Sequence, residues 1–281
     1  MNTVTEKPIQ IKTAPLPFWQ TDLSETFRLL GAPGRFVRAN LLLLWTVILF
    51  AVWSLSLIRG MPYPSEVWRA FQEMYASNEN NNLVITTYTT LKLNVLGLFW
   101  AALGSLVFSY ISVIPFLYPL NKFLQWLRYI PIIAFNLIFL SFFAIGANMK
   151  IAMLAVGMSF FLITGMTAEI AAIPRLKFEL ARVLNYSDWR TFYTVVLRPT
   201  LPKMIDIVAQ NAAIGWTMIV AIENFDRTEG GIGAQMFFLA NQPAKVYVYL
   251  IIIGIIAVLE DQLFVWLKRL LFPYTQISER A

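Results

Sequence analysis

The residue types that carry most enzyme chemistry are missing from this sequence. Its 281 residues include no histidine and no cysteine, which excludes thiol nucleophiles, imidazole bases, disulfides and Cys/His metal sites. No metal site is therefore expected. The ionisable candidates that remain are acids inside apolar stretches, namely Glu223, Glu260 and Asp261. Charged groups in such surroundings are energetically costly and are therefore functional candidates. However, acids and hydroxyls are the only reactive groups left, so an intramembrane enzyme is the least favoured class of protein.

The composition indicates an integral membrane protein. Hydrophobic residues make up 58% of the chain and charged residues 14%, with a mean hydropathy of +0.62, whereas a soluble domain carries about 25% charged residues. The formal net charge of +6 could suggest nucleic acid binding. However, the basic residues flank long apolar runs, so they are interpreted as determinants of membrane topology and no nucleic acid partner is expected.

Six apolar segments are long enough to cross a bilayer, which requires about 20 residues. They cover residues 39–58, 93–121, 129–149, 151–168, 203–222 and 246–267, the third and fourth being separated by a short turn at 146–150. Placing residues 1–39 inside leaves 16 Lys and Arg on inner segments and 6 on outer ones. This asymmetry predicts that both termini are cytoplasmic.

The expected organisation has three parts. Residues 1–39 lack the apolar core of a secretory signal and form a cytoplasmic segment, with a possible surface-lying helix at 23–30. Residues 40–270 form the transmembrane domain, and residues 271–281 form a cytoplasmic tail.

The longest inner loop, about residues 169–202, has the pattern of two short helices joined by a bend. Asn185 suits the left-handed residue that ends a helix, and Ser187 or Asp188 suits the start of the next. That second helix, 189–197, is expected to stop before Pro199. A surface-lying connector is the alternative interpretation. The first helix is marked by apolar residues at helical spacing: Leu176, Leu180, Val183 and Leu184.

The segment Glu179-Leu180-Ala181-Arg182-Val183-Leu184-Asn185, followed by Leu197-Arg198-Pro199 and Leu201-Pro202, resembles the EAA loop of ABC importer permeases. The family pattern is Glu-Ala-Ala, three residues, Gly, and a later Leu-Pro; here Leu180 and Asn185 depart from it. Further motifs stand in the order seen in the nitrate/sulfonate/taurine/bicarbonate permeases: Pro62-Tyr63-Pro64, Arg128-Tyr129-Ile130-Pro131, Gly215-Trp216, Glu223 and Gly231-Ile232-Gly233.

The resemblance implies an all-α, six-span permease of the type I ABC importer architecture, in the bacterial cytoplasmic (inner) membrane. It also implies that the loop helix docks on a cytoplasmic ATPase. The chain has no GxxxxGK[ST] phosphate loop, so it is expected to catalyse no reaction and to hold no cofactor, with ATP and Mg²⁺ bound by two ATPase subunits. A second permease copy and an extracytoplasmic solute-binding protein complete the expected assembly. The ATPase-coupling residues would be Leu176, Glu179, Leu180, Ala181, Arg182, Val183, Leu184 and Asn185.

The fifth span is expected to line the translocation pathway. One helical face of this span would point toward a two-fold axis that relates the chain to the second permease copy; it carries Asn211, Gly215, Met218 and Ile222. Hydrogen bonding between helices explains the polar residues equally well. Glu223 could line an outer gate or hold the loop 224–233. The expected pathway-lining residues are Gln210, Asn211, Gly215, Thr217, Met218 and Glu223.

Other polar and small residues in the spans have structural interpretations. Glu260 and Asp261 are expected to pair with Lys268 or another basic residue of the inner face. Small residues on the second span favour close helix packing; they are Gly97, Ala101, Gly104 and Ser105.

The predicted function is transport of a small anion such as nitrate, bicarbonate, taurine or another sulfonate, delivered by a solute-binding protein. A vitamin or vitamin precursor is the alternative cargo. A secondary transporter is a further alternative, but it would need an energy-coupling site near the midplane, which the sequence does not show.

Overall fold

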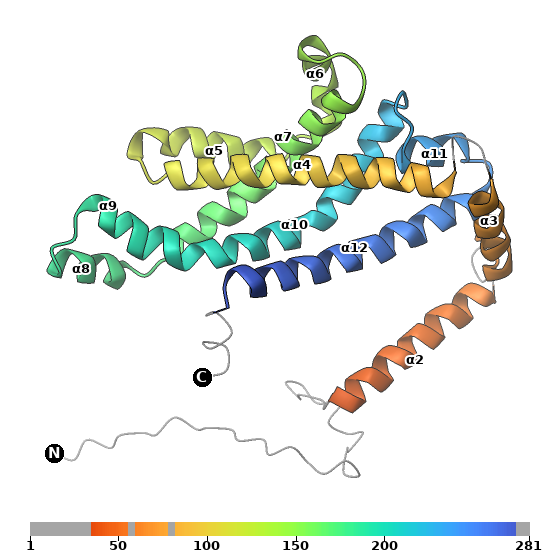
Figure 1. The fold of residues 1–281 in the computed structure, drawn as a ribbon, viewed down its shortest axis with the longest axis horizontal. Helices are drawn as coiled ribbons and strands as arrows, with labels where there is room; N and C mark the ends of the chain where they lie inside the picture. The colour runs from red at the N-terminus through yellow and green to blue at the C-terminus, as the bar shows by residue number, and fades with distance from the viewer. Residues whose placement is uncertain (1–34, 56–59, 78–81, 274–281) are drawn as a thin grey trace. The chain divides into compact units, whose positions relative to one another are not determined.

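The computed structural model describes residues 35–55, 60–77 and 82–273, and every regular element within these ranges is helical (Figure 1). Two compact units divide the chain, residues 1–64 and residues 65–281. The predicted surface helix at 23–30 lies outside the described residues, as does most of the predicted tail.

The first unit contains one long helix, α2 (Arg35–Ser54). Leucine, isoleucine and phenylalanine side chains are exposed along it, as expected for a helix in lipid. At its end the Trp53 indole Nε1 donates a hydrogen bond to the Pro62 carbonyl at 2.8 Å. This helix corresponds to the first predicted span, with a core of 16 residues (39–54) that is short for a full crossing.

Four long apolar helices dominate the second unit, each long enough to span a membrane. They are α4 (Leu83–Ile111), α7 (Ala147–Ala171), α10 (Arg198–Phe225) and α12 (Pro243–Leu271). α7 packs against both α4 and α10, and α10 also packs against α12. The short helices α8 (Arg175–Val183) and α9 (Asp188–Thr191) lie at one end of α10, and α11 (Ile232–Phe238) lies at its other end (Figure 1).

Small residues bring α4 and α7 together. A methyl group placed on Gly97 would stand 2.5 Å from the Leu154 side chain of α7. Ala101 and Ser105 are fully buried, and the Ser105 hydroxyl donates to the Ser159 carbonyl at 3.3 Å. The predicted packing stripe is confirmed at these three positions. It does not include Gly104, where an added methyl would meet nothing within 4 Å.

The third predicted span, 129–149, is wrong as a continuous helix. Within it only Ile132–Phe142 is helical before α7 begins at Ala147. This short stretch forms one arm of a broken pair, and the other arm, Pro115–Leu127, lies before the predicted span and includes the end of the predicted second span; the two arms are bent by 110°. Pro131 caps the second arm, and its missing N–H prevents the preceding turn from continuing. The elements of the pair are η1 (Pro115–Leu117), α5 (Tyr118–Leu127), η2 (Ile132–Phe135) and α6 (Asn136–Phe142).

Three lysines counted among the six outer basic residues lie inside long helices: Lys92 in α4, Lys150 in α7 and Lys245 in the first turn of α12. α4 begins nine residues before Lys92, which is exposed. The predicted turn at 146–150 is shorter than expected, because α7 begins directly after Gly146 and takes in Lys150, which is fully buried. The remaining helix, α3 (Pro64–Ala76), packs its residues Val67, Ala70 and Met74 inward.

Candidate functional site

The loop that follows α7 contains the predicted helix and bend. α8 ends in a Schellman motif, in which the Tyr186 N–H donates to the Ala181 carbonyl at 3.0 Å and the Asn185 N–H donates to the Arg182 carbonyl at 2.9 Å. Asn185 has φ +52° and is the only non-glycine residue with positive φ in the described part of the chain. Its predicted role as the left-handed residue is confirmed.

The second helix of the loop begins as predicted but does not stop. The Ser187 hydroxyl accepts a hydrogen bond from the Arg190 N–H at 3.4 Å. From there α9 runs through a π-helical segment, η3 (Phe192–Leu197), directly into α10. The expected stop before Pro199 is therefore wrong, because the wider π turn takes up the change of hydrogen-bond register next to the prolines. The loop and the fifth span form one continuous helix, Asp188–Phe225.

α8 is anchored on one side and exposes apolar side chains on the other. Ala181 is buried and Phe178 packs against the core. In contrast, Leu180 is 52% exposed and Val183 is 82% exposed. Of the predicted ATPase-coupling residues, Ala181 is buried and the other seven are exposed: Leu176, Glu179, Leu180, Arg182, Val183, Leu184 and Asn185. A contiguous exposed apolar surface outside the spans is typical of a docking site.

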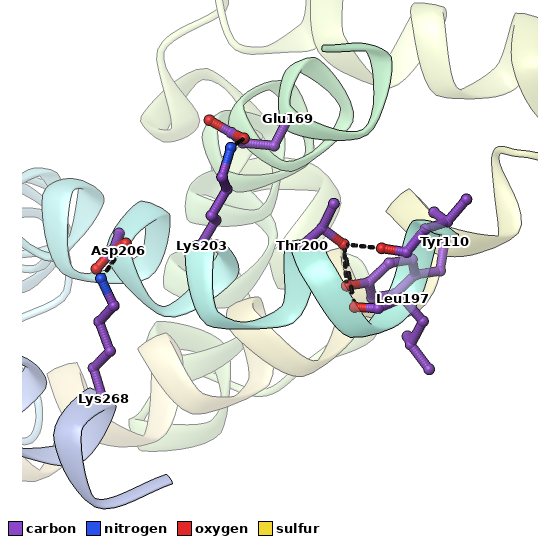
Figure 2. Close-up of polar contacts among 8 residues, drawn as sticks. Tyr110, Glu169, Leu197, Thr200, Lys203, Asp206 and Lys268 are labelled. Carbon is purple, nitrogen blue, oxygen red and sulfur yellow. Dashed lines mark hydrogen bonds and ion pairs between the residues drawn. The ribbon is translucent and has the colours of Figure 1, made fainter. Parts of the chain in front are cut away.

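Polar contacts fix the first turns of α10 to the other long helices (Figure 2). The hydroxyls of Tyr110 on α4 and Thr200 on α10 lie 2.9 Å apart. The Tyr110 ring also meets the Phe192 ring edge-on, with centroids 6.0 Å apart. The loop-proximal end of α10 is thus packed directly against α4.

Two ion pairs extend this contact to α7 and α12. Lys203 of α10 pairs with Glu169 of α7 at 2.6 Å, and Lys268 of α12 pairs with Asp206 of α10 at 2.9 Å (Figure 2). Both pairs are partly exposed, so each contributes little stability by itself. Together with the Tyr110–Thr200 contact, they connect the first turns of α10, next to the loop, to α4, α7 and α12.

The expected pairing of Glu260 or Asp261 with Lys268 is wrong. Lys268 pairs with Asp206, and Glu260 accepts a hydrogen bond from the Trp216 indole Nε1 at 2.7 Å. Positions 260 and 268 stand about 12 Å apart along α12 at 1.5 Å per residue, so side chains of the neighbouring helix α10 supply the partners instead.

At the opposite end of α10, Glu223 holds the following loop. Its buried carboxylate accepts hydrogen bonds from the Thr90 hydroxyl at 2.8 Å and from the Gly233 N–H at 2.8 Å. The Thr90 oxygen in turn accepts from the Ile232 N–H at 2.7 Å. Only glycine fits at 233, because an added methyl would overlap the Val220 carbonyl oxygen. Of the two predicted roles of Glu223, this geometry favours the loop-holding one.

A charge cluster beside Glu223 was missed by sequence reasoning. The Lys150 ammonium is buried without a hydrogen-bond partner in the described residues, and it interacts electrostatically with Asp226, Glu223 and Glu229. The signal available in the sequence was a lysine within an apolar stretch soon after Gly146.

Asp226, just beyond the end of α10, ties this loop to α7. Its carboxylate accepts hydrogen bonds from the Thr228 hydroxyl at 2.6 Å and the Gly146 N–H at 3.0 Å. Burial acts to raise the pKa of Asp226, but these hydrogen bonds and the charge of Lys150 outweigh it and hold the pKa below its ordinary value.

The residues predicted to line a pathway are divided between the interior and the surface. Gly215 and Glu223 are buried, and a methyl on Gly215 would stand 3.0 Å from Asn94 Oδ1 of α4. Asn211 and Met218 are half-buried, whereas Gln210 and Thr217 are exposed. The exposed polar and small residues of α10 form a stripe along one face: Gln210, Ala213, Thr217 and Asn224.

An apolar cleft lies on the opposite side of α10. It has a volume of about 900 Å³ and is formed by α4, α10 and α12. Its α10 lining includes Met204 and Val208, and Val208 is half a turn away from Thr217 at 100° per residue. The two faces of α10 therefore differ sharply in polarity.

These features define a class: a polytopic helical membrane protein with a structured loop that exposes an apolar docking face. A family model described as "Binding-protein-dependent transport system inner membrane component" matches residues 94–273. The chain belongs to this family and is a permease subunit of an ABC importer.

Relatives and solved structures agree with this family. The chain is 26% identical over 251 residues to a Bacillus subtilis (strain 168) protein provisionally named aliphatic sulfonates transport permease SsuC, covering 84% of this chain and 88% of that one. A provisionally named ABC transporter permease of Methanocaldococcus jannaschii is 24% identical over 158 residues, covering 53% of this chain and 59% of that one.

In fold, the chain resembles a subunit of the MetNI methionine ABC transporter in an inward-facing conformation, with a TM-score of 0.58 and 18% identity over 66% of this chain and 94% of that one. It also resembles a chain of an amino acid ABC transporter solved with histidines, with a TM-score of 0.55 and 17% identity over 73% and 95%. These matches confirm the predicted type I ABC importer permease fold and the predicted subfamily.

Proposed function

We propose that this permease imports a small organosulfonate or a related oxyanion, and that its cargo passes along the exposed stripe of α10. The stripe offers the amide of Gln210, the hydroxyl of Thr217 and the amide of Asn224, all exposed and uncharged, along one face of the span. Neutral donors of this kind can hydrogen-bond an anion without trapping it by full charge. Similarity to the sulfonate relative supports the substrate class.

Coupling to ATP hydrolysis is assigned to α8. Its exposed side chains Leu180 and Val183 would enter a groove on the ATPase subunit, and the continuous helix Asp188–Phe225 would carry the displacement into the stripe. The exposed apolar face of α8 is the observation on which this assignment rests, because apolar side chains displayed outside the spans are typical of a protein-binding surface. The family implies the ATPase and binding-protein partners.

A second copy of the chain, related by a two-fold axis along the membrane normal, is the proposed partner in the membrane. The α10 stripes of the two copies would then face each other across the pathway. The proposed location is the bacterial inner membrane, with α8 on the cytoplasmic side.

The substrate is tested by uptake of labelled taurine, an alkanesulfonate, nitrate and bicarbonate in cells with and without this gene, each also depleted of ATP. We expect gene-dependent and ATP-dependent uptake of a sulfonate. Uptake of none of these four compounds would overturn the substrate class and favour a vitamin or its precursor, and uptake that persists without ATP while the proton gradient is intact would favour a secondary transporter.

The pathway is tested by Thr217→Val, which keeps the shape of the side chain and removes the hydroxyl. The matched control is Thr87→Val on α4, because both hydroxyls bond only to carbonyls of their own helix, at 2.8 Å and 2.7 Å. We expect uptake to fall in the first variant alone. Equal uptake in both would contradict the assignment of the stripe.

The coupling face is tested by Glu179→Arg and Val183→Glu. Each should abolish co-purification with the ATPase subunit, while the permease keeps a single gel-filtration peak. Unchanged co-purification of both variants would remove α8 as the docking element.

A further inference from the structure

α3, which precedes the first long helix of the second unit, has three distinct faces. The first packs inward through Val67, Ala70 and Met74. The second is polar and exposed, and includes Arg69, Gln72 and Glu73. A helix that only covered the bundle would need no third face, because one buried face satisfies the contact with protein and one polar face satisfies the contact with water.

The third face is aromatic. Trp68, Phe71 and Tyr75 follow one another at spacings of three and four, and their rings stack with centroids 5.5 Å and 6.1 Å apart. Trp68 is 60% exposed and Tyr75 is 61% exposed. At 100° per residue this face lies about a quarter turn from the packed face, so the stack is not part of the protein core.

Two contacts hold α3 at the level where spans begin. The Asn82 amide donates to the Ser77 carbonyl at 2.7 Å just after α3, and its oxygen accepts from the Val84 N–H at 2.9 Å in the first turn of α4. Glu73 pairs with Lys245, in the first turn of α12, at 2.8 Å. α3 is thus fixed beside the first turns of α4 and α12.

We propose that the aromatic face of α3 (Trp68, Phe71 and Tyr75) inserts into the lipid headgroup region on the side of the membrane opposite α8. Trp and Tyr concentrate at that level because their rings are apolar and their tips are polar. An interfacial helix combines such a face with a charged one. The exposed apolar residues Ile85 and Tyr88 begin the lipid-facing surface of α4 just after Asn82, so α3 precedes the point in the chain at which this surface starts.

This inference goes beyond the transport function and assigns α3 as an anchor that sets the depth of the bundle. The competing occupant is an extracytoplasmic protein docked on the same face. The two are separable, because lipid contact requires no added protein.

The test uses single-cysteine variants, which need no removal of native cysteines from this chain because it has none; the purified permease is labelled before it is assembled with its partners. Nitroxide labels at Trp68→Cys and Tyr75→Cys report the aromatic face, and labels at Arg69→Cys and Gln72→Cys report the polar face as matched controls one helix turn or less away. The assembled transporter is reconstituted in phospholipid vesicles. Collision rates are measured with oxygen, which partitions into lipid, and with a water-soluble nickel chelate.

We expect the ratio of oxygen to nickel collisions at 68 and 75 to exceed that at 69 and 72 severalfold. Equal ratios at all four positions would overturn the proposal. Nickel access at 68 and 75 that is lost only after a solute-binding protein is added would also overturn it, in favour of protein docking.

Discussion

The bend at Asn185 gives a direct measure of how much loop geometry matters for coupling. This residue has φ +52°, where an alanine pays about 1–2 kcal/mol because its Cβ crowds the following carbonyl. Glycine has no such penalty, and asparagine lies between them. Asn185→Ala should therefore weaken the native bend by about 1 kcal/mol, whereas Asn185→Gly should leave it unchanged or slightly more stable.

A loss of about 1 kcal/mol corresponds to about a fivefold change in an equilibrium constant. If α8 must carry this bend to dock, the dissociation constant for the ATPase subunit should rise by up to about fivefold in Asn185→Ala, the limit reached when the bend is mostly lost, and stay at the wild-type value in Asn185→Gly. The assay is a binding titration of detergent-solubilised permease with the ATPase. The melting temperature of the permease itself should hardly move, because α8 buries only Ala181 fully.

The glycine variant is the control that separates backbone geometry from side-chain contact. Equal losses of affinity in the alanine and glycine variants would refute the conformational argument, since they would show that the Asn185 side chain contacts the ATPase. Equal retention would show that docking does not depend on the bend.

Three further predictions concern the bundle. Gly97→Ala should destabilise the folded permease by about 1–3 kcal/mol through overpacking. Gly104→Ala on the same helix should instead stabilise it by up to about 1 kcal/mol, because the added methyl meets open space. Equal shifts of the two variants in thermal unfolding in detergent would contradict this. The pKa of Asp226 is depressed below its ordinary value of 3.8, so the ionised carboxylate stabilises the folded protein above that pH, and this stabilisation is lost as the pH falls through the depressed pKa. Asp226→Asn should therefore flatten the acid limb of a plot of melting temperature against pH. An unaltered limb would refute the role of the carboxylate. Trp216→Phe should lower the free energy of unfolding by about 1–3 kcal/mol, because it leaves Glu260 without its hydrogen-bond donor. Adding Glu260→Leu should recover part of that loss in the same unfolding assay. Strict additivity of the two effects would show that the side chains are not coupled.

Local features of this protein could be predicted from the sequence because they depend on neighbouring residues. The left-handed Asn185, the Ser187 cap and the packing role of Gly97 all follow from rules that act within one turn or one face. The membrane class follows from composition, and the loop motif together with the ordered motifs outside it predicted the family.

Features that depend on partners distant in sequence could not be predicted. The pairing of Lys268 with Asp206, the Trp216–Glu260 hydrogen bond and the buried setting of Lys150 each need a second helix brought alongside. The same holds for the face of α10: the sequence placed polar residues on the helix, but only packing against α4 and α7 turned Gly215 inward and left Thr217 exposed. A single apolar helix has no strong amphipathic signal when all its sides are apolar, so the tertiary contacts decide which side meets protein and which side is left for lipid, pathway or partner.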